Sequence, residues 1–73
     1  MLLKEVESSS LKFIGYESDE ELLGIVLKSL PDVIYYYKGV PKNIYFRLNN
    51  AKSKGKFFVK EIKNTFSFTK IKK

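Results

Sequence analysis

The sequence predicts an α+β domain in which an antiparallel meander of three to four strands packs against two C-terminal helices. Apolar residues alternate with a period of two over residues 11–38, and the period lengthens to about three and a half after Gly39. Turn residues separate the early segments at intervals too short for crossover connections. At 73 residues the chain is long enough for one domain, so we expect a single domain over residues 1–73.

Three consecutive strands are expected near residues 9–17, 21–29 and 32–38. Ser18, Asp19 and Glu20 form the first turn, and Pro31 marks the second. Loops this short join antiparallel neighbours, which makes the three strands a meander. Alternation returns over residues 67–71 and is compatible with a short fourth strand at the edge.

Two helices are expected near residues 41–51 and 54–65. Pro41 suits a first helical turn, and Ser53 is a good N-cap residue for the second helix. The apolar stripe of the first helix comprises Ile44, Tyr45, Leu48 and Ala51, and that of the second comprises Phe58, Ile62 and Thr65 or Phe66. The outer face of the second helix carries a basic stripe formed by Lys56, Lys60 and Lys63.

Charge divides the chain into an acidic and a basic half. Residues 1–33 carry a formal charge of −4 and residues 34–73 a charge of +10, which gives +6 overall. This division predicts a polarised molecule with an anionic partner, while the alternative is an ordinary lysine-rich solvated surface. A turn with four carboxylates, Glu17, Asp19, Glu20 and Glu21, lacks the spacing of a calcium loop and is expected to be solvated.

The composition argues against catalysis. The chain has no Cys and no His, so the commonest general base, nucleophile and transition-metal ligands are absent. We therefore expect no enzymatic activity, no metal and no cofactor. The longest apolar stretch, residues 22–27, is far too short to cross a membrane, and the acidic start does not resemble a signal peptide, which favours a cytoplasmic protein.

The ordered motifs of the chain resemble the KTSC domain. They comprise residues 6–11, 14–17, 35–37 and 40–41, followed by Ile44, Tyr45, Leu48, Ala51, Ser53, Gly55, Phe57, Phe58, Ile62 and Phe66. The family is named for its occurrence at the C-terminus of some lysyl-tRNA synthetases, and the resemblance implies RNA binding. Phe46 and Val59 stand where the family pattern has a polar residue and Asn, which suggests an interface for a partner or for self-association.

Candidate ligand-binding residues fall in two groups. The run from Lys52 to Lys56 begins the second helix, where unpaired amides and the helix dipole favour phosphate, although Ser53 could merely cap and Gly55 merely make room for the neighbouring helix. Tyr35 and Tyr36 lie on opposite faces of their strand, so either could stack on a base if its face is open, while the alternative is core packing. The complete set of expected ligand-binding residues is Arg47, Ser53, Lys54, Gly55, Lys56, Lys60, Lys63, Tyr35 and Tyr36.

The sequence thus predicts a non-enzymatic binding protein for phosphate-bearing ligands. The ligand would be RNA, or a small signalling nucleotide held by a homo-oligomer, as in small phage anti-defence proteins that sequester such nucleotides. An alternative function is a protein-interaction module whose basic face docks an acidic protein partner. Phe46 and Val59 are the predicted interface residues of a homodimer or larger oligomer.

Overall fold

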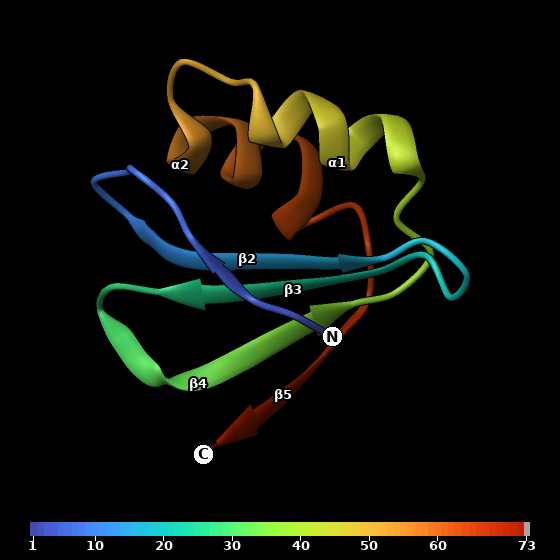
Figure 1. Cartoon of the computed structure of the whole chain (residues 1–73), viewed down its shortest axis with the longest axis horizontal. Helices are drawn as coiled ribbons and strands as arrows, with labels where there is room; N and C mark the ends of the chain where they lie inside the picture. The colour runs from blue at the N-terminus through green and yellow to red at the C-terminus, as the bar shows by residue number, and fades with distance from the viewer. Residues whose placement is uncertain (73) are drawn as a thin grey trace.

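The computed structural model describes residues 1–72, which fold as an antiparallel sheet with the helices on one face (Figure 1). Within this range the sheet has five strands in sequential order: β1 (Lys4–Glu5), β2 (Leu11–Glu17), β3 (Leu22–Leu27), β4 (Leu30–Tyr37) and β5 (Phe68–Lys72). The helices are α1 (Lys42–Asn49) and α2 (Lys54–Phe58), and α2 runs directly into a π-helical turn, η1 (Val59–Lys63).

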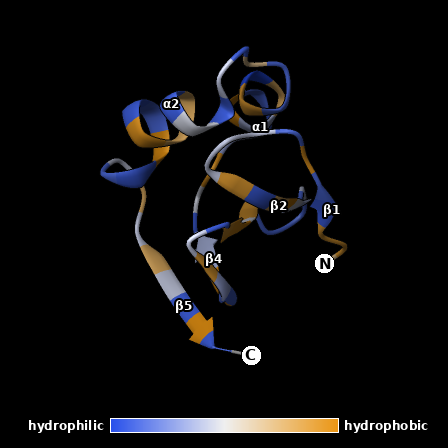
Figure 2. Ribbon diagram, turned by 90° about the vertical axis from the view of Figure 1, so that its left-hand side faces the viewer, coloured by the Kyte–Doolittle hydropathy of each residue, from blue (hydrophilic) through white to orange (hydrophobic). Residues whose placement is uncertain are grey.

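The predicted α+β class, the antiparallel meander and the two helices are confirmed, but two details of the fold prediction are wrong. Residues 1–72 form five strands rather than three or four, because β1 adds a two-residue pairing with β2. The helices lie between β4 and β5 rather than at the C-terminus, because β5 returns along the outer edge of β4. Figure 2 shows β5 at this outer edge, below α2.

A bulge in β2 determines which residues face the helices. Leu11 pairs with Leu27, whereas Phe13 pairs with Val26, so the register shifts between them. Because of this shift Leu11 and Ile14 both point toward the helices, although simple alternation would place them on opposite faces. Both join the buried core between sheet and helices, whose other buried members are Leu23, Ile25, Tyr37, Val40, Leu48, Phe58 and Ile62.

The opposite face of the sheet is covered by the start of the chain. Gly15 and Gly24 are paired on β2 and β3, and they leave a strip without side chains. The carbonyl oxygen of Leu2 would lie 2.7 Å from a Cβ atom at Gly15, and the Met1 sulfur 2.7 Å from one at Gly24. Glycine at these positions leaves room for the N-terminal segment, and at Gly15 the neighbour is the Leu2 backbone, which a side chain there would displace.

The second helical segment departs from the single regular helix predicted over residues 54–65. It changes from α to π geometry at Val59 and ends at Lys63. The wider turn keeps Ile62 fully buried in the core, while Val59 remains about half exposed. Within residues 1–72, no helix is long and apolar enough to span a membrane.

Candidate ligand-binding cleft

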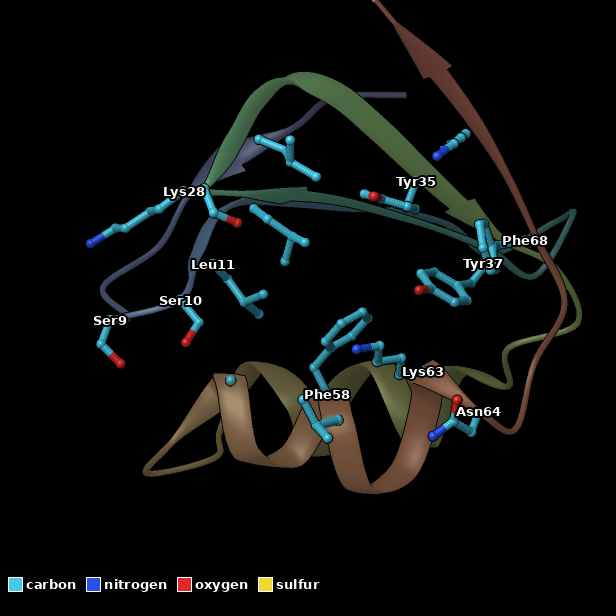
Figure 3. Close-up of a pocket in the computed structure, with 16 residues that line it drawn as sticks. Ser9, Ser10, Leu11, Lys28, Tyr35, Tyr37, Phe58, Lys63, Asn64 and Phe68 are labelled. Carbon is cyan, nitrogen blue, oxygen red and sulfur yellow. The ribbon is translucent and has the colours of Figure 1, made fainter.

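A cleft of about 630 Å³ opens between the sheet and the α2–η1 segment (Figure 3). Aromatic side chains from both walls meet in it: Tyr35, Tyr37 and Phe68 come from the sheet, and Phe58 comes from α2. The rim is lined by Lys28, Lys63 and Lys70, with polar side chains from Ser9, Ser10, Ser29 and Asn64, and Figure 3 shows the Lys28 ammonium group directed away from the cleft. No acidic residue lines the cleft within the described chain.

The aromatic floor is a connected cluster. The Tyr37 ring meets Phe58 edge-on, with centroids 5.5 Å apart, and lies 5.3 Å from the ring of Phe68. Tyr35 contacts Phe68 edge-on at 5.5 Å. Because Phe68 is still 48% exposed, the cluster continues from the buried core to the open surface. Such a surface offers planar apolar contact to a ligand that enters the cleft.

Tyr37 presents an unpaired hydroxyl group in this cleft. The residue is only 3% exposed, and its hydroxyl makes no hydrogen bond within residues 1–72. Figure 3 shows the hydroxyl directed into the space between sheet and helix. Burial, with a smaller contribution from Tyr35, raises the pKa of Tyr37 above its usual value, so the group stays protonated at neutral pH and can donate a hydrogen bond.

The positive charges around the cleft are not neutralised by the protein itself. The one ion pair among residues 1–72 joins the Met1 amino group to Glu17 at 3.8 Å, and it involves no lysine. Lys28 also borders a separate depression that contains Glu5 and Glu7. Lys63 and Lys70 have no such acidic neighbours in the cleft lining, so this side of the cleft favours an anion.

A second, shallower depression adjoins the cleft on the outer side of α2. It is lined by Ser9, Ser10, Ser53, Gly55, Lys56, Val59 and Lys60. The lining includes three serines and two lysines and contains no aromatic ring. We refer to it below as the outer depression.

The structure brings most of the predicted ligand-binding residues to these two depressions. Tyr35 and Lys63 line the cleft, Ser53, Lys56 and Lys60 line the outer depression, and Gly55 borders both. Three predicted residues lie elsewhere. Tyr36 is on the opposite face of the sheet, beside Gly24. Arg47 lies over the Phe57 ring, with its guanidinium 5.2 Å from the ring centroid. Lys54 lines neither depression.

The run that begins α2 has a structural role in addition to its charge. Ser53 caps the helix, since its hydroxyl oxygen accepts a hydrogen bond from the Lys56 amide at 3.4 Å. A Cβ atom at Gly55 would lie 2.8 Å from the Ser10 hydroxyl oxygen, so the glycine lets α2 pack on the loop before β2. Ser10 therefore occupies the space beside the Gly55 backbone, and the neighbour accommodated there is this loop rather than α1.

Sequence reasoning missed several residues that line the cleft. Tyr37 shares a strand face with Tyr35, as alternation predicts, but it was not selected as a ligand-binding residue. Phe68 and Lys70 belong to the edge strand, whose position beside β4 was not assigned from the sequence. Ser9, Ser10 and Lys28 reach the cleft from loops at the ends of β2 and β3, and no local pattern indicates this proximity.

The two predicted interface residues are both exposed. Phe46 on α1 is 52% exposed and Val59 on η1 is 53% exposed. Val59 borders the cleft and the outer depression, whereas Phe46 borders neither.

Comparisons with known proteins agree with this architecture. The family model of the KTSC domain matches residues 7–66, and a comparison with curated protein sequences found no match. Among solved structures, the crystal structure of a KTSC domain protein from Yersinia pestis is similar, with a TM-score of 0.90 and 36% sequence identity, covering 96% of each chain. On the extent of the family match, the chain belongs to the KTSC domain family.

Proposed function

We propose that this domain is a non-enzymatic, cytoplasmic binding protein for phosphate-bearing ligands that carry a nucleobase. One observation supports the proposal most directly: an aromatic cleft with lysines on its rim and no acidic residue in its described lining. The cleft volume of about 630 Å³ lies within the range usual for small-molecule sites.

The two kinds of side chain match the two parts of a nucleotide. Bases stack on exposed aromatic rings with about 1–3 kcal/mol per base, whatever their sequence. Phosphate groups bind lysine ammonium groups, which are compact charges with three donors. In the cleft, the rings of Tyr35 and Phe68 would contact the base, while Lys63 and Lys70 would contact phosphate.

Both RNA and a small nucleotide carry this chemistry. The RNA assignment rests on the resemblance to domains attached to lysyl-tRNA synthetases, and the small-nucleotide assignment rests on the size and charge of the chain. The cleft accommodates either source, because each supplies a base next to a phosphate.

Isothermal titration with adenosine monophosphate and with a single-stranded RNA hexamer tests the proposal. We expect Lys63→Glu to weaken binding of both probes at least tenfold, because it places a negative charge on the rim of the cleft. Lys42→Glu makes the same charge change on α1, away from the cleft, and should have a much smaller effect.

Protein purified without nuclease should also absorb more at 260 nm than its tyrosines and phenylalanines explain, owing to bound nucleotide. The proposal fails if neither probe binds and the purified protein carries no nucleotide. Binding of an acidic polypeptide in place of both probes would instead support the alternative function as a protein-interaction module.

A further inference from the structure

The cleft and the outer depression are neighbours with a common wall. Both are lined by Ser9, Ser10, Gly55 and Val59. The wall consists of the close contact between Gly55 and Ser10, together with Ser9 and the half-exposed Val59. Because both spaces open to solvent, a ligand seated in the cleft can pass over the outer rim of this wall to the outer side of α2.

The two spaces differ in what they can hold. The cleft offers aromatic rings together with Lys63 and Lys70, so it can take a base and a phosphate. The outer depression is lined by serines, Gly55, Val59, Lys56 and Lys60, so its lysines can bind a phosphate at its edge but it gives a base nothing to stack on.

The polar groups of the wall are available to a ligand. Within residues 1–72, the Ser9 and Ser10 hydroxyls make no hydrogen bond, whereas the nearby Ser8 hydroxyl already accepts from the amides of Ser10 and Leu11. Neither Lys56 nor Lys60 forms an ion pair with the described residues. Two unneutralised lysines on one outer surface thus lie beside two free donors.

We infer that the ligand is a nucleoside unit flanked by two phosphate groups. Its base lies in the cleft beside Tyr37, one phosphate lies at Lys63 and Lys70, and the second crosses the wall to Lys56 and Lys60. This inference rests on the proposed function and makes it more specific. Such a unit occurs in a linear dinucleotide that carries a 5′-phosphate, as the diadenylate probe below does, and inside any single nucleic-acid strand.

Four adenine probes separate these possibilities: adenosine monophosphate, adenosine 3′,5′-bisphosphate, a linear diadenylate and an adenylate RNA hexamer. Titrated calorimetrically at one fixed salt concentration, the bisphosphate should bind about tenfold tighter than the monophosphate, because it adds a charge-assisted contact. The double variant Lys56→Gln/Lys60→Gln should remove this advantage and weaken bisphosphate binding much more than monophosphate binding. The control variant Lys42→Gln/Lys52→Gln removes two charges outside both spaces, and it should preserve the tighter binding of the bisphosphate.

The outcomes distinguish this inference from the proposed function. Equal affinity for monophosphate and bisphosphate, or equal weakening of both by the Lys56/Lys60 pair, overturns the inference while the proposed function stands. If no probe binds, both fail. Affinity that rises further from diadenylate to hexamer supports the inference with a nucleic-acid strand as the source, and affinity that stops at diadenylate supports it with a small ligand. Far-ultraviolet circular dichroism of each variant checks that its fold is retained.

Discussion

Gly15 and Gly24 face each other on neighbouring strands, and the start of the chain lies against both. At Gly15 an added Cβ would meet the backbone carbonyl of Leu2 at 2.7 Å, which cannot rotate away. We therefore expect Gly15→Ala to lower the free energy of unfolding by about 1–3 kcal/mol, as overpacking usually does. Urea denaturation measures this change.

Gly24→Ala provides the matched comparison for Gly15→Ala. There the closest atom is the Met1 sulfur at 2.7 Å, in a flexible side chain that can move. Alanine also restricts the unfolded chain, which favours folding by about 0.4–1 kcal/mol. Gly24→Ala should consequently cost less than Gly15→Ala, and the reverse order would show that the chain start does not lie on the glycine strip.

Tyr16 joins the sheet to the loop before α1. Its hydroxyl donates a 2.6 Å hydrogen bond to the Val40 carbonyl, and its ring stacks on Tyr45 at 4.8 Å. Tyr16→Phe keeps the stack and loses the hydrogen bond, so the free energy of unfolding should fall by about 1 kcal/mol. Thermal unfolding of both proteins at pH 7 gives the comparison.

The pH dependence of stability provides a second measurement on Tyr16. Burial, and then the charge of Glu21, raise its pKa above the usual value of 10.0. The folded state therefore holds the Tyr16 proton more tightly than the unfolded state does. The contribution of this proton to the free energy of unfolding is fully present below pH 10 and is lost as pH rises through the pKa of the folded state. Between pH 9 and pH 11, the free energy of unfolding should fall less in Tyr16→Phe than in the unmodified protein. An identical fall in the two proteins would contradict the raised pKa of Tyr16.

At the scale of elements, α2 packs on the loop before β2 through Gly55 and Ser10. A Cβ at Gly55 would lie 2.8 Å from the Ser10 Oγ and 3.0 Å from its Cβ. Gly55→Ala should therefore destabilise the fold by about 1–2 kcal/mol, despite the higher helix propensity of alanine. Adding Ser10→Gly removes both atoms and should recover most of this loss.

A double-mutant cycle by urea denaturation tests this pairing. The coupling between the two substitutions should be favourable and on the order of 1 kcal/mol. Simple additivity would mean that α2 does not press on this loop.

Periodicity predicted the three central strands and α1 well because each is long enough to repeat its pattern. It missed β1, which has only two residues, and the change to π geometry at Val59, which follows from burying Ile62 in the core. For the site, spacing predicted Lys56 and Lys60 on one outer surface, but Lys63 lies apart from them and lines the cleft. The aromatic cleft was not predictable, because Tyr37, Phe58 and Phe68 come from three elements whose mutual packing depends on the whole fold.

At the scale of the whole molecule, the charge division of the sequence becomes a partial separation in space. The sheet follows the sequence order, so β1, β2 and β3 of the acidic half lie together, but the helices of the basic half pack over them. The separation survives locally, because the cleft and the outer depression are lined by lysines without carboxylates, while Glu5 and Glu7 border a different depression. The position of the charges therefore carries more functional information than the net charge of +6.

Self-association is the last prediction, and it concerns two exposed apolar residues on the helical layer. Phe46 is 52% exposed and Val59 is 53% exposed, and burying them against a second copy would stabilise a small domain that has limited core of its own.

We expect the protein to sediment as a homodimer or larger. Phe46→Glu should dissociate it, because a charge buried in an apolar contact is costly, whereas Asn43→Glu on the same helix should not. Analytical ultracentrifugation at high micromolar concentration decides the question: a monomeric unmodified protein would contradict the prediction. Because Val59 also borders the cleft, an assembly that buries it would bring a second copy to the edge of the ligand site.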